Sequence, residues 1–476
     1  MDYEVVIGLE IHAELKTKTK AFCSCKNEFG ASINTNICPV CMGLPGALPT
    51  INKTCVEYTI KAGLCFGCDI NHEAIFERKN YFYPDLSKAY QISQLEKPVC
   101  INGAIKYVLD GKEMTCGIDN IHMEEDAGKS IHNEKLNVSL IDYNRCGVPL
   151  IEIVTKPDIR SSKQAVAVFE AIRDNLNAIE VSDCKMQEGS IRCDVNVSIH
   201  KPNTPFGTRT EMKNLNSFKA VQRAIDYEVE RQKQLLKNNE RIVQETLKWD
   251  DNKGKNFSLR SKEDSNDYRY FPDPDLLRVE IDDEYINEIK ATLPELPLER
   301  KKRYKEVLNL PDYDIEVLTG NKVVNKFYED CISLYNNPKS VSNWVMSDIM
   351  RRIKDNIEEE LTIPVSPKNF VRLIEMFDKK ELTINSAREV LDYVWDNDQD
   401  IDSAVQELGL KQENNEDLVK SYCEEAIKNN PQAVKDYKNG NQRSLTFFMG
   451  QVMKLSKGKA NPQMVNKMIV ELLNNM

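Results

Sequence analysis

The sequence has little proline, little glycine and no long hydrophobic run. Proline and glycine number 19 each among 476 residues, which excludes collagen-like and low-complexity protein. No stretch approaches the roughly 18 consecutive apolar residues of a membrane helix, and Met1-Asp2-Tyr3-Glu4 lacks the basic and apolar regions of a secretory leader. We therefore expect a folded, cytoplasmic chain without membrane contact, long enough for about three domains.

The motifs of common hydrolases are also missing. The sequence has five histidines, none paired at helical spacing, and neither H-E-x-x-H nor G-x-S-x-G occurs. Ala127-Gly128-Lys129-Ser130 resembles the end of a phosphate-binding loop, but Met123 stands where the first glycine is required. Glu124, Glu125 and Asp126 would also repel phosphate there. These features argue against metalloproteases, classical hydrolases and P-loop nucleotide binding.

Basic residues are outnumbered but gather at one end. Lys and Arg total 64 against 75 Asp and Glu, a net charge of −11, so the whole surface is not a field for polyanions. From Pro431 onward the chain carries +5 and the remainder −16. Any contact with nucleic acid is therefore expected to be local. The seven basic residues of this tail are Lys435, Lys438, Arg443, Lys454, Lys457, Lys459 and Lys467.

The 14 cysteines include two close pairs, Cys23-x-Cys25 and Cys38-x-x-Cys41. Without an export signal, clustered cysteines are expected to stay reduced and bind metal. Tetrahedral Zn²⁺ takes four thiolates, and this spacing predicts a structural zinc site. Cys65 and Cys68 form a third pair, which either replaces the first pair or consists of buried thiols. The other eight cysteines are expected in the core.

Alternating apolar residues predict strands at 5–15 and 191–199, and Asp110-Gly111 predicts a two-residue hairpin turn. Helical periodicity is confined to about 161–178 and 217–237 within the first part of the chain. We expect an α+β fold, with residues 1–292 forming an antiparallel-sheet domain. Leu293-Pro294-Glu295-Leu296-Pro297 ends the strand pattern, which predicts an all-α domain at 293–410 and a small helical bundle at 411–476.

Several of the expected strands carry acidic or basic residues on one face. Glu10 and His12 are two residues apart, as are His122 and Glu124, and Glu152 interrupts an apolar strand. A buried carboxylate needs a cation or another partner. Oxygen ligands with one His and nearby Arg or Lys suit Mg²⁺ that carries nucleotide phosphates. The alternative is an ordinary solvated strand face. Further candidates on such faces are Arg192, Asp194, Arg209, Glu211 and Lys213.

Long motifs carry a family resemblance. They are Gly43–Pro49, Asn80–Leu86, Tyr90–Gln94, Glu124–Ser130, Gln187–Asp194, Gly207–Ser217 and Asp267–Leu276. In order and in content they resemble the B subunit of the bacterial aspartyl/glutamyl-tRNA(Asn/Gln) amidotransferase, and the resemblance covers essentially the whole chain.

The resemblance implies a ligase that forms a carbon–nitrogen bond. In this family the B subunit uses Mg-ATP to phosphorylate the side-chain carboxylate of misacylated Glu-tRNA(Gln) or Asp-tRNA(Asn), and ammonia then displaces the phosphate. Glutamine hydrolysis in the partner A subunit supplies the ammonia, and a small C subunit completes a heterotrimer. The implied first domain is a cradle of antiparallel sheet, and the implied tRNA-binding element is the basic tail. Which of the two tRNA substrates is used is left open.

Residue roles follow from these positions. Glu10, His12, Glu124 and Glu152 are the expected Mg²⁺ ligands, with Glu125 as the alternative to Glu124. Asp194 and Glu211 are expected to hold a second metal. The expected phosphate-stabilising cations are Lys79, Lys88, Arg192, Arg209 and Lys213. The zinc held by Cys23, Cys25, Cys38 and Cys41 is expected to be structural.

Two other functions remain open. A non-catalytic RNA-binding scaffold would need only the basic tail. An enzyme acting on a free small-molecule carboxylate would need the carboxylate faces without the tail. Neither accounts for the long motifs.

Overall fold

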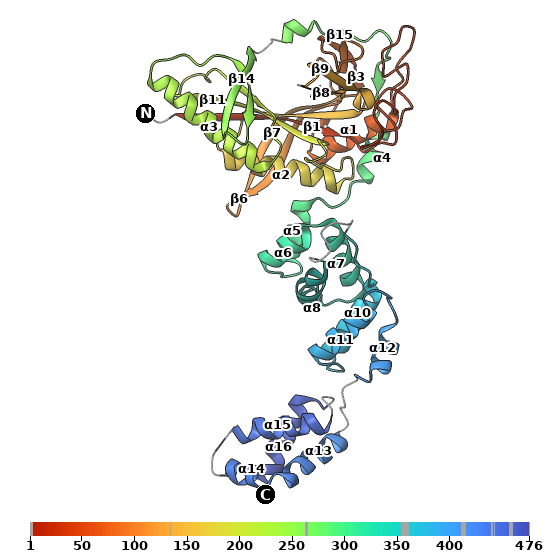
Figure 1. Cartoon of the computed structure of the whole chain (residues 1–476), viewed down its shortest axis with the longest axis vertical. Helices are drawn as coiled ribbons and strands as arrows, with labels where there is room; N and C mark the ends of the chain where they lie inside the picture. The colour runs from red at the N-terminus through yellow and green to blue at the C-terminus, as the bar shows by residue number, and fades with distance from the viewer. Residues whose placement is uncertain are drawn as a thin grey trace. The chain divides into compact units, whose positions relative to one another are not determined.

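The computed structural model describes residues 3–133, 135–261, 265–353, 361–410, 416–438, 441, 443–456 and 460–475. The chain divides into two compact units, Met1–Glu299 and Arg300–Met476 (Figure 1). The domain boundary predicted after residue 292 falls directly behind α4 (Asp283–Ala291). The boundary predicted at 410/411 adjoins residues 411–415, which lie outside the described part of the chain.

The first unit is built on one large sheet. In the described residues nine strands are hydrogen-bonded in the order β14-β13-β12-β11-β1-β10-β7-β6-β2. Their bounds are β14 (Lys255–Ser261), β13 (Glu245–Asp250), β12 (Thr210–Lys213), β11 (Ile191–His200), β1 (Glu4–Glu14), β10 (Pro149–Thr155), β7 (Lys112–Glu125), β6 (Cys100–Leu109) and β2 (Asp69–Ile70). Mixed strands and helices confirm the predicted α+β class.

One strand pair departs from the antiparallel expectation. β12 and β13 run parallel, whereas the other neighbouring pairs of this sheet are antiparallel. Two adjacent parallel strands need a long crossover between them, and α3 (Phe218–Lys237) provides it. The hairpin predicted at Asp110-Gly111 joins β6 to β7, and both turn residues have positive φ, 50° and 74°.

The two faces of the sheet have different neighbours. α1 (Lys53–Cys65), α2 (Ser162–Ala178) and α3 pack on one face, where they bury the apolar residues of the strands. α2 and α3 begin at Ser161 and Ser217, whose side chains accept hydrogen bonds from the backbone N–H groups of the first turn. In Figure 1 these two helices lie together beneath the sheet. The opposite face carries the polar side chains.

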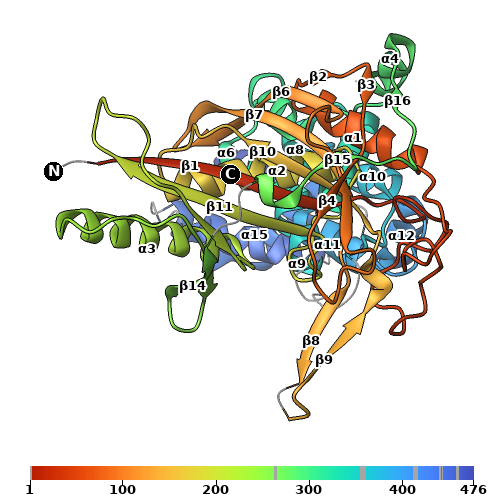
Figure 2. The ribbon, with the colours of Figure 1, turned by 90° about the horizontal axis from the view of Figure 1, so that it is seen from above.

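Smaller elements surround the polar face. β15 (Phe271–Pro272), β4 (Glu77–Asn80) and β5 (Tyr90–Ser93) form a three-stranded sheet, and β16 (Val279–Glu280) pairs with β3 (Glu73–Ala74). β8 (Lys129–Asn133) and β9 (Val138–Asp142) form a hairpin that projects away from the large sheet (Figure 2). Two short turns of 3₁₀ helix, η1 (Tyr143–Arg145) and η2 (Ser265–Tyr268), complete the unit.

The second unit is helical in the residues described. Its elements, with α5 leading in from the first unit, are α5 (Pro297–Glu306), α6 (Asp312–Thr319), α7 (Lys322–Leu334), α8 (Pro338–Trp344), the π-helical turn η3 (Val345–Ile349), α9 (Met350–Ile353), α10 (Pro367–Asp378), α11 (Ile384–Val394), α12 (Ile401–Leu408), α13 (Glu416–Asn429), α14 (Pro431–Lys438), α15 (Arg443–Leu455) and α16 (Pro462–Asn474). It has two separate cores, one within 304–405 and one within 419–473. None of the helices that the structure describes is long and apolar enough to cross a membrane.

Candidate active site and metal centre

Four neighbouring strands bring one row of polar residues together on the open face of the sheet. The strand register places His12 of β1 opposite Glu152 of β10, and Glu152 opposite His122 of β7. His12 Nε2 lies 3.4 Å from a carboxylate oxygen of both Glu152 and Glu124, and His122 Nε2 lies 3.2 Å from Glu152. One ligand atom each of His12, Glu124 and Glu152 falls within 4.8 Å of the others. These three residues could hold a metal ion.

The charges of this group depend on one another. Burial lowers the pKa of His12, but Glu152 and Glu124 outweigh that effect and raise it to about 9. Burial raises the pKa of Glu152, yet His12 and His122 hold it well below its ordinary value. The buried carboxylate therefore has histidine partners on two sides.

A second acidic group lies on the adjacent strands. Glu10, Asp194 and Glu211 each offer an oxygen within 4.8 Å of the other two. Lys213 Nζ lies 2.6 Å from Asp194 and 3.3 Å from Glu211. The amide of Asn196 donates to Glu10. The strand register explains the grouping, because Glu10 faces Asp194 across the β1–β11 pair while His12 faces Glu152 on the other side. The structure thus places Glu10 with Asp194 and Glu211, although the sequence pattern placed it with His12.

Both groups border a cavity of about 440 Å³. Its charged lining residues are His12, Lys79, Asp85, Glu124, Asp126, Arg145, Arg192, Asp194 and Lys213. Burial lowers the pKa of Lys79, but the nearby Tyr270, Glu124 and Glu152 outweigh it and hold that pKa above its ordinary value. Arg192 and Arg145 lie 3.1 Å and 3.3 Å from Asp126. Cations thus stand next to oxygen ligands, as a site for phosphate and a divalent metal requires.

Three of the expected site residues lie outside this cavity. The Lys88 ammonium pairs with Oε1 of Glu125, which also accepts a hydrogen bond from the Ile92 N–H at 3.0 Å. Glu124 rather than Glu125 shares the face of His122, because β7 has no bulge at its end. Arg209 is exposed and borders a second cavity of about 580 Å³ on the same face of the sheet, together with Val6, Glu10, Val154 and Phe206.

The structure also adds residues that the sequence analysis missed. Asp126 and Arg145 line the cavity from loops, where no strand alternation indicates a direction. Asp126 directly follows Glu124 and Glu125, so the acidic run itself was the available signal. Arg145 had no such signal. His122 was noted on the face of Glu124, but its contact with Glu152 depends on the register between β7 and β10.

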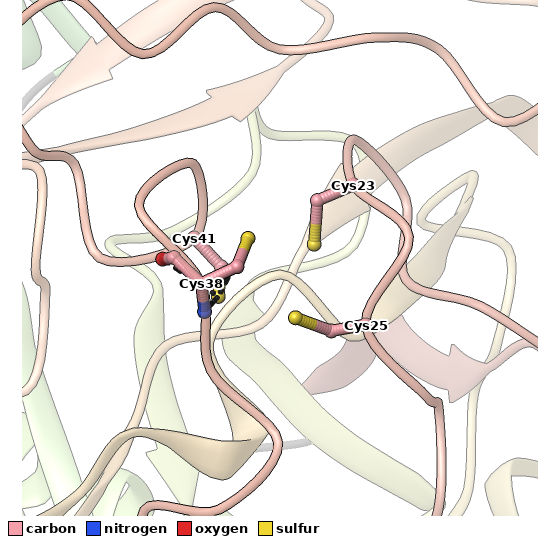
Figure 3. Close-up of side chains that lie close together, drawn as sticks. All are labelled: Cys23, Cys25, Cys38 and Cys41. Carbon is pink, nitrogen blue, oxygen red and sulfur yellow. Dashed lines mark hydrogen bonds between the residues drawn. The ribbon is translucent and has the colours of Figure 1, made fainter.

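A separate cluster contains the four cysteines of the two close pairs. Figure 3 shows the side chains of Cys23 and Cys25 directed toward those of Cys38 and Cys41. The four sulfurs lie within 4.8 Å of one another, and those of Cys38 and Cys41 are 3.8 Å apart. Four sulfurs around one tetrahedral ion with bonds of about 2.3 Å would be about 3.8 Å apart. The donor set therefore fits one metal ion.

The chemistry of these thiols also suits a metal. A hydrogen bond from Cys23 lowers the pKa of Cys41 to about 4, helped by Lys20 and opposed by burial. Burial raises the pKa of Cys25 to about 11. Cys65 and Cys68 are not in this group: Cys65 lies at the end of α1, where its thiol contacts Asn175. The structure therefore selects the first two cysteine pairs.

The fold and the two sites together define a class of protein: an α+β domain with an acidic, cation-lined cavity, joined to helical domains. The chain belongs to the GatB family. Residues 5–287 match the GatB/GatE catalytic domain, and residues 326–473 match the GatB domain.

Curated relatives agree along the whole chain. The B subunit of the aspartyl/glutamyl-tRNA(Asn/Gln) amidotransferase from Caldicellulosiruptor bescii is 50% identical over 477 residues, covering 99% of both chains. Those of Lachnoclostridium phytofermentans and Persephonella marina are 48% and 47% identical, covering 99% of this chain and 99% and 100% of their own. The predicted family is confirmed, and the chain is a component of a glutamine-dependent amidotransferase.

Proposed function

We propose that this chain uses ATP to phosphorylate the side-chain carboxylate of Glu-tRNA(Gln), Asp-tRNA(Asn) or both. Ammonia from a glutaminase partner then gives Gln-tRNA(Gln) or Asn-tRNA(Asn). The family and the names of the relatives support the tRNA-dependent amidation. The observation that carries the ATP-dependent step is the cavity in which two groups of oxygen ligands stand beside Lys79, Arg192 and Lys213.

The chemistry takes two displacements. An oxygen of the substrate carboxylate attacks the γ-phosphorus of ATP, and the bond to ADP breaks. Ammonia then attacks the carbonyl carbon of the acyl phosphate, inorganic phosphate leaves with the electron pair, and the nitrogen loses one proton. The first step is needed because an oxide is a poor leaving group from a carboxylate, whereas phosphate is a good one.

The two cavities suggest where ATP binds. Glu10 borders the second cavity and faces Asp194, which borders the first. A nucleotide with its base in the second cavity, near Val6 and Phe206, would direct its phosphates toward the group of Glu10, Asp194 and Glu211. Arg209 at the same cavity would lie near the phosphates. The substrate carboxylate would then lie in the first cavity.

Magnesium fits both acidic groups, because carboxylate oxygens are its preferred protein ligands. When bound, it neutralises phosphate charge in the transition state. Glu10, Asp194 and Glu211 would hold one ion, and His12, Glu124 and Glu152 another. Lys79, Arg192 and Lys213 are placed to stabilise the transferring phosphoryl group. Lys88, paired with Glu125, would act by holding that carboxylate.

We also propose a structural Zn²⁺ at Cys23, Cys25, Cys38 and Cys41. Four thiolates complete a tetrahedral shell and leave no position for substrate. The partners are an amidase A subunit and a small C subunit. The relatives are named as one lettered component of an amidotransferase, which supports a complex of several different chains.

Glu10→Ala and Glu124→Ala test the catalytic assignment in the assembled complex. Each should lower formation of the acyl phosphate on misacylated tRNA by roughly 10²-fold or more, because transition-state charge loses its stabilisation. Free ammonia as the donor removes the partner's contribution. Glu113→Ala is the control, since Glu113 is an exposed carboxylate near the far end of the same strand as Glu124. Near wild-type rates in both site variants would exclude the assignment, and assays with both tRNAs would define the substrate.

A further inference from the structure

Lys20 is completely buried next to the four-cysteine cluster. Its exposed fraction is 0%. Lysine is almost never fully buried unless its charge is paired. The ammonium lies 2.7 Å from the backbone oxygen of Asn36 and 3.8 Å from Sγ of Cys41. Both contacts belong to the segment that carries the second cysteine pair.

No carboxylate among the described residues forms an ion pair with Lys20. Glu125 is the candidate for such a partner. A Cβ atom on Gly147 would lie 3.6 Å from Cδ of Lys20, 3.5 Å from Cβ of Cys41 and 3.7 Å from Oε2 of Glu125, so all three residues converge on this glycine. The charge of Glu125 is already balanced by Lys88. The ammonium of Lys20 therefore needs another source of negative charge.

We propose that Lys20 is the charge partner of the metal–thiolate centre. Four thiolates around one divalent ion carry a net charge of about −2, given that each ligand sulfur is deprotonated. The Lys20 ammonium points an N–H at the Cys41 sulfur and neutralises part of that charge in a region closed to water. Lys20 binds no metal itself, so it is a positioning residue that acts through Cys41. Its contact with Asn36 also fixes the turn from which Cys38 and Cys41 project.

The proposal rests on the proposed zinc site and makes a specific energetic claim. With metal present, the buried ammonium lies beside negative charge and is stabilised. Without metal, the thiols are largely protonated and the ammonium has lost its partner, which is costly in a buried site. Removing the charge of Lys20 should therefore have opposite consequences in the zinc-loaded and the zinc-free protein.

The first test measures zinc affinity by chelator competition in the full-length chain. Lys20→Met keeps most of the side-chain length and removes the charge, and it should weaken zinc binding about 10–100-fold, as loss of a group that supports a metal ligand does. Lys20→Arg keeps the charge and should retain most of the affinity. Lys26→Met is the matched control, because Lys26 adjoins Cys25 but its side chain is 77% exposed. Lys26→Met should leave zinc affinity unchanged.

The second test compares thermal unfolding with and without zinc, together with the charge-transfer absorption of the cobalt-substituted chain. Lys20→Met should lower the melting temperature of the zinc-loaded chain, leave that of the zinc-free chain equal or higher, and shift the sulfur-to-cobalt band. Lys20→Gln carries the same expectations if Lys20→Met does not fold. Unchanged zinc affinity, equal losses in both metal states, or equal zinc loss in the Arg and Met variants would overturn the proposal. Wild-type chain that contains no metal would instead refute the zinc site itself.

Discussion

At the scale of single residues, Cys38 provides the sharpest test of the metal centre. Cys38→Ser should reduce the zinc content from about one ion per chain and lower stability, because one of four tetrahedral ligands is lost. Elemental analysis of anaerobically purified protein measures this directly. Cys65→Ser is the control, since Cys65 lies outside the cluster. Full zinc in Cys38→Ser, or a loss in the control, would contradict the assignment.

The neighbours Glu124 and Glu125 should respond differently to substitution. Glu125 and Lys88 form a pair whose side chains are only 4% and 10% exposed. Glu125→Ala should therefore destabilise the first unit by about 3 kcal/mol, because it leaves a buried ammonium without its partner. Glu124→Gln should instead lose activity with little change in stability.

Thermal unfolding and acyl phosphate formation, measured on both variants, separate these outcomes. A stable, inactive Glu125→Ala would return Glu125 to the catalytic group. An active Glu124→Gln would remove Glu124 from it.

At the scale of elements, the π-helical turn η3 is tied to its surroundings by Asp348. Its side chain is 1% exposed and accepts hydrogen bonds from Ser347 at 2.7 Å, Arg388 at 3.1 Å and Arg352 at 3.3 Å. Burial raises the pKa of Asp348, but these donors outweigh it and hold the pKa below its ordinary value. The charged carboxylate thus joins η3, α9 and α11.

Asp348→Asn should destabilise the helical unit by about 2–3 kcal/mol near neutral pH, because Arg352 stays nearly buried without its charge partner. The folded-state pKa lies below the unfolded one, so this stabilisation is present above the unfolded pKa and is lost as the pH falls through the folded pKa. The difference between wild type and variant should therefore shrink below about pH 4. Urea unfolding followed by the fluorescence of Trp344 and Trp395 measures it.

The exposed Asp396 supplies the control for this prediction. Asp396→Asn should unfold as the wild type does at each pH. A constant difference between wild type and Asp348→Asn from pH 7 to pH 3 would show that the carboxylate charge does not stabilise the turn.

At the scale of the whole molecule, the basic tail is the part that the proposed function requires for tRNA. In the tail, Lys438, Arg443 and Lys454 are exposed on a small bundle with its own core of α13, α15 and α16 residues. Lys457 and Lys459 lie outside the described residues. Leu455, expected within the apolar stripe, is 36% exposed, whereas Ile469 and Leu473 are buried. The bundle can therefore present cations without giving up its core.

Deleting 411–476 from the complex should weaken tRNA binding and flatten its dependence on salt, because fewer counterions are released from the RNA. ATP binding and assembly with the partner subunits should persist. The triple variant Lys438→Gln, Arg443→Gln and Lys454→Gln is the finer test, since it keeps the bundle and should reduce the salt slope by up to about three contacts. An unchanged dissociation constant and salt slope in the deletion would exclude the tail as the tRNA site.

Local pattern in the sequence was sufficient for the elements and for the family. The alternation of Val5 to Leu15 predicted β1, the Asp110-Gly111 pair predicted the β6–β7 turn, and both long helices of the first unit begin next to their predicted starts. The spacing of four cysteines identified the metal cluster. Each of these depends on residues close together in the chain, where side-chain direction follows from the backbone period alone.

Contacts between distant segments were decided only by the tertiary structure. Alternation showed that Glu10 and His12 share a face, but only the register of β1 between β10 and β11 assigned them to different groups. The pairing of Glu125 with Lys88 and the burial of Lys20 likewise depend on loops that meet across the fold. A strand pattern with a period of two fixes which face a side chain takes, while long-range pairing fixes which neighbour it meets.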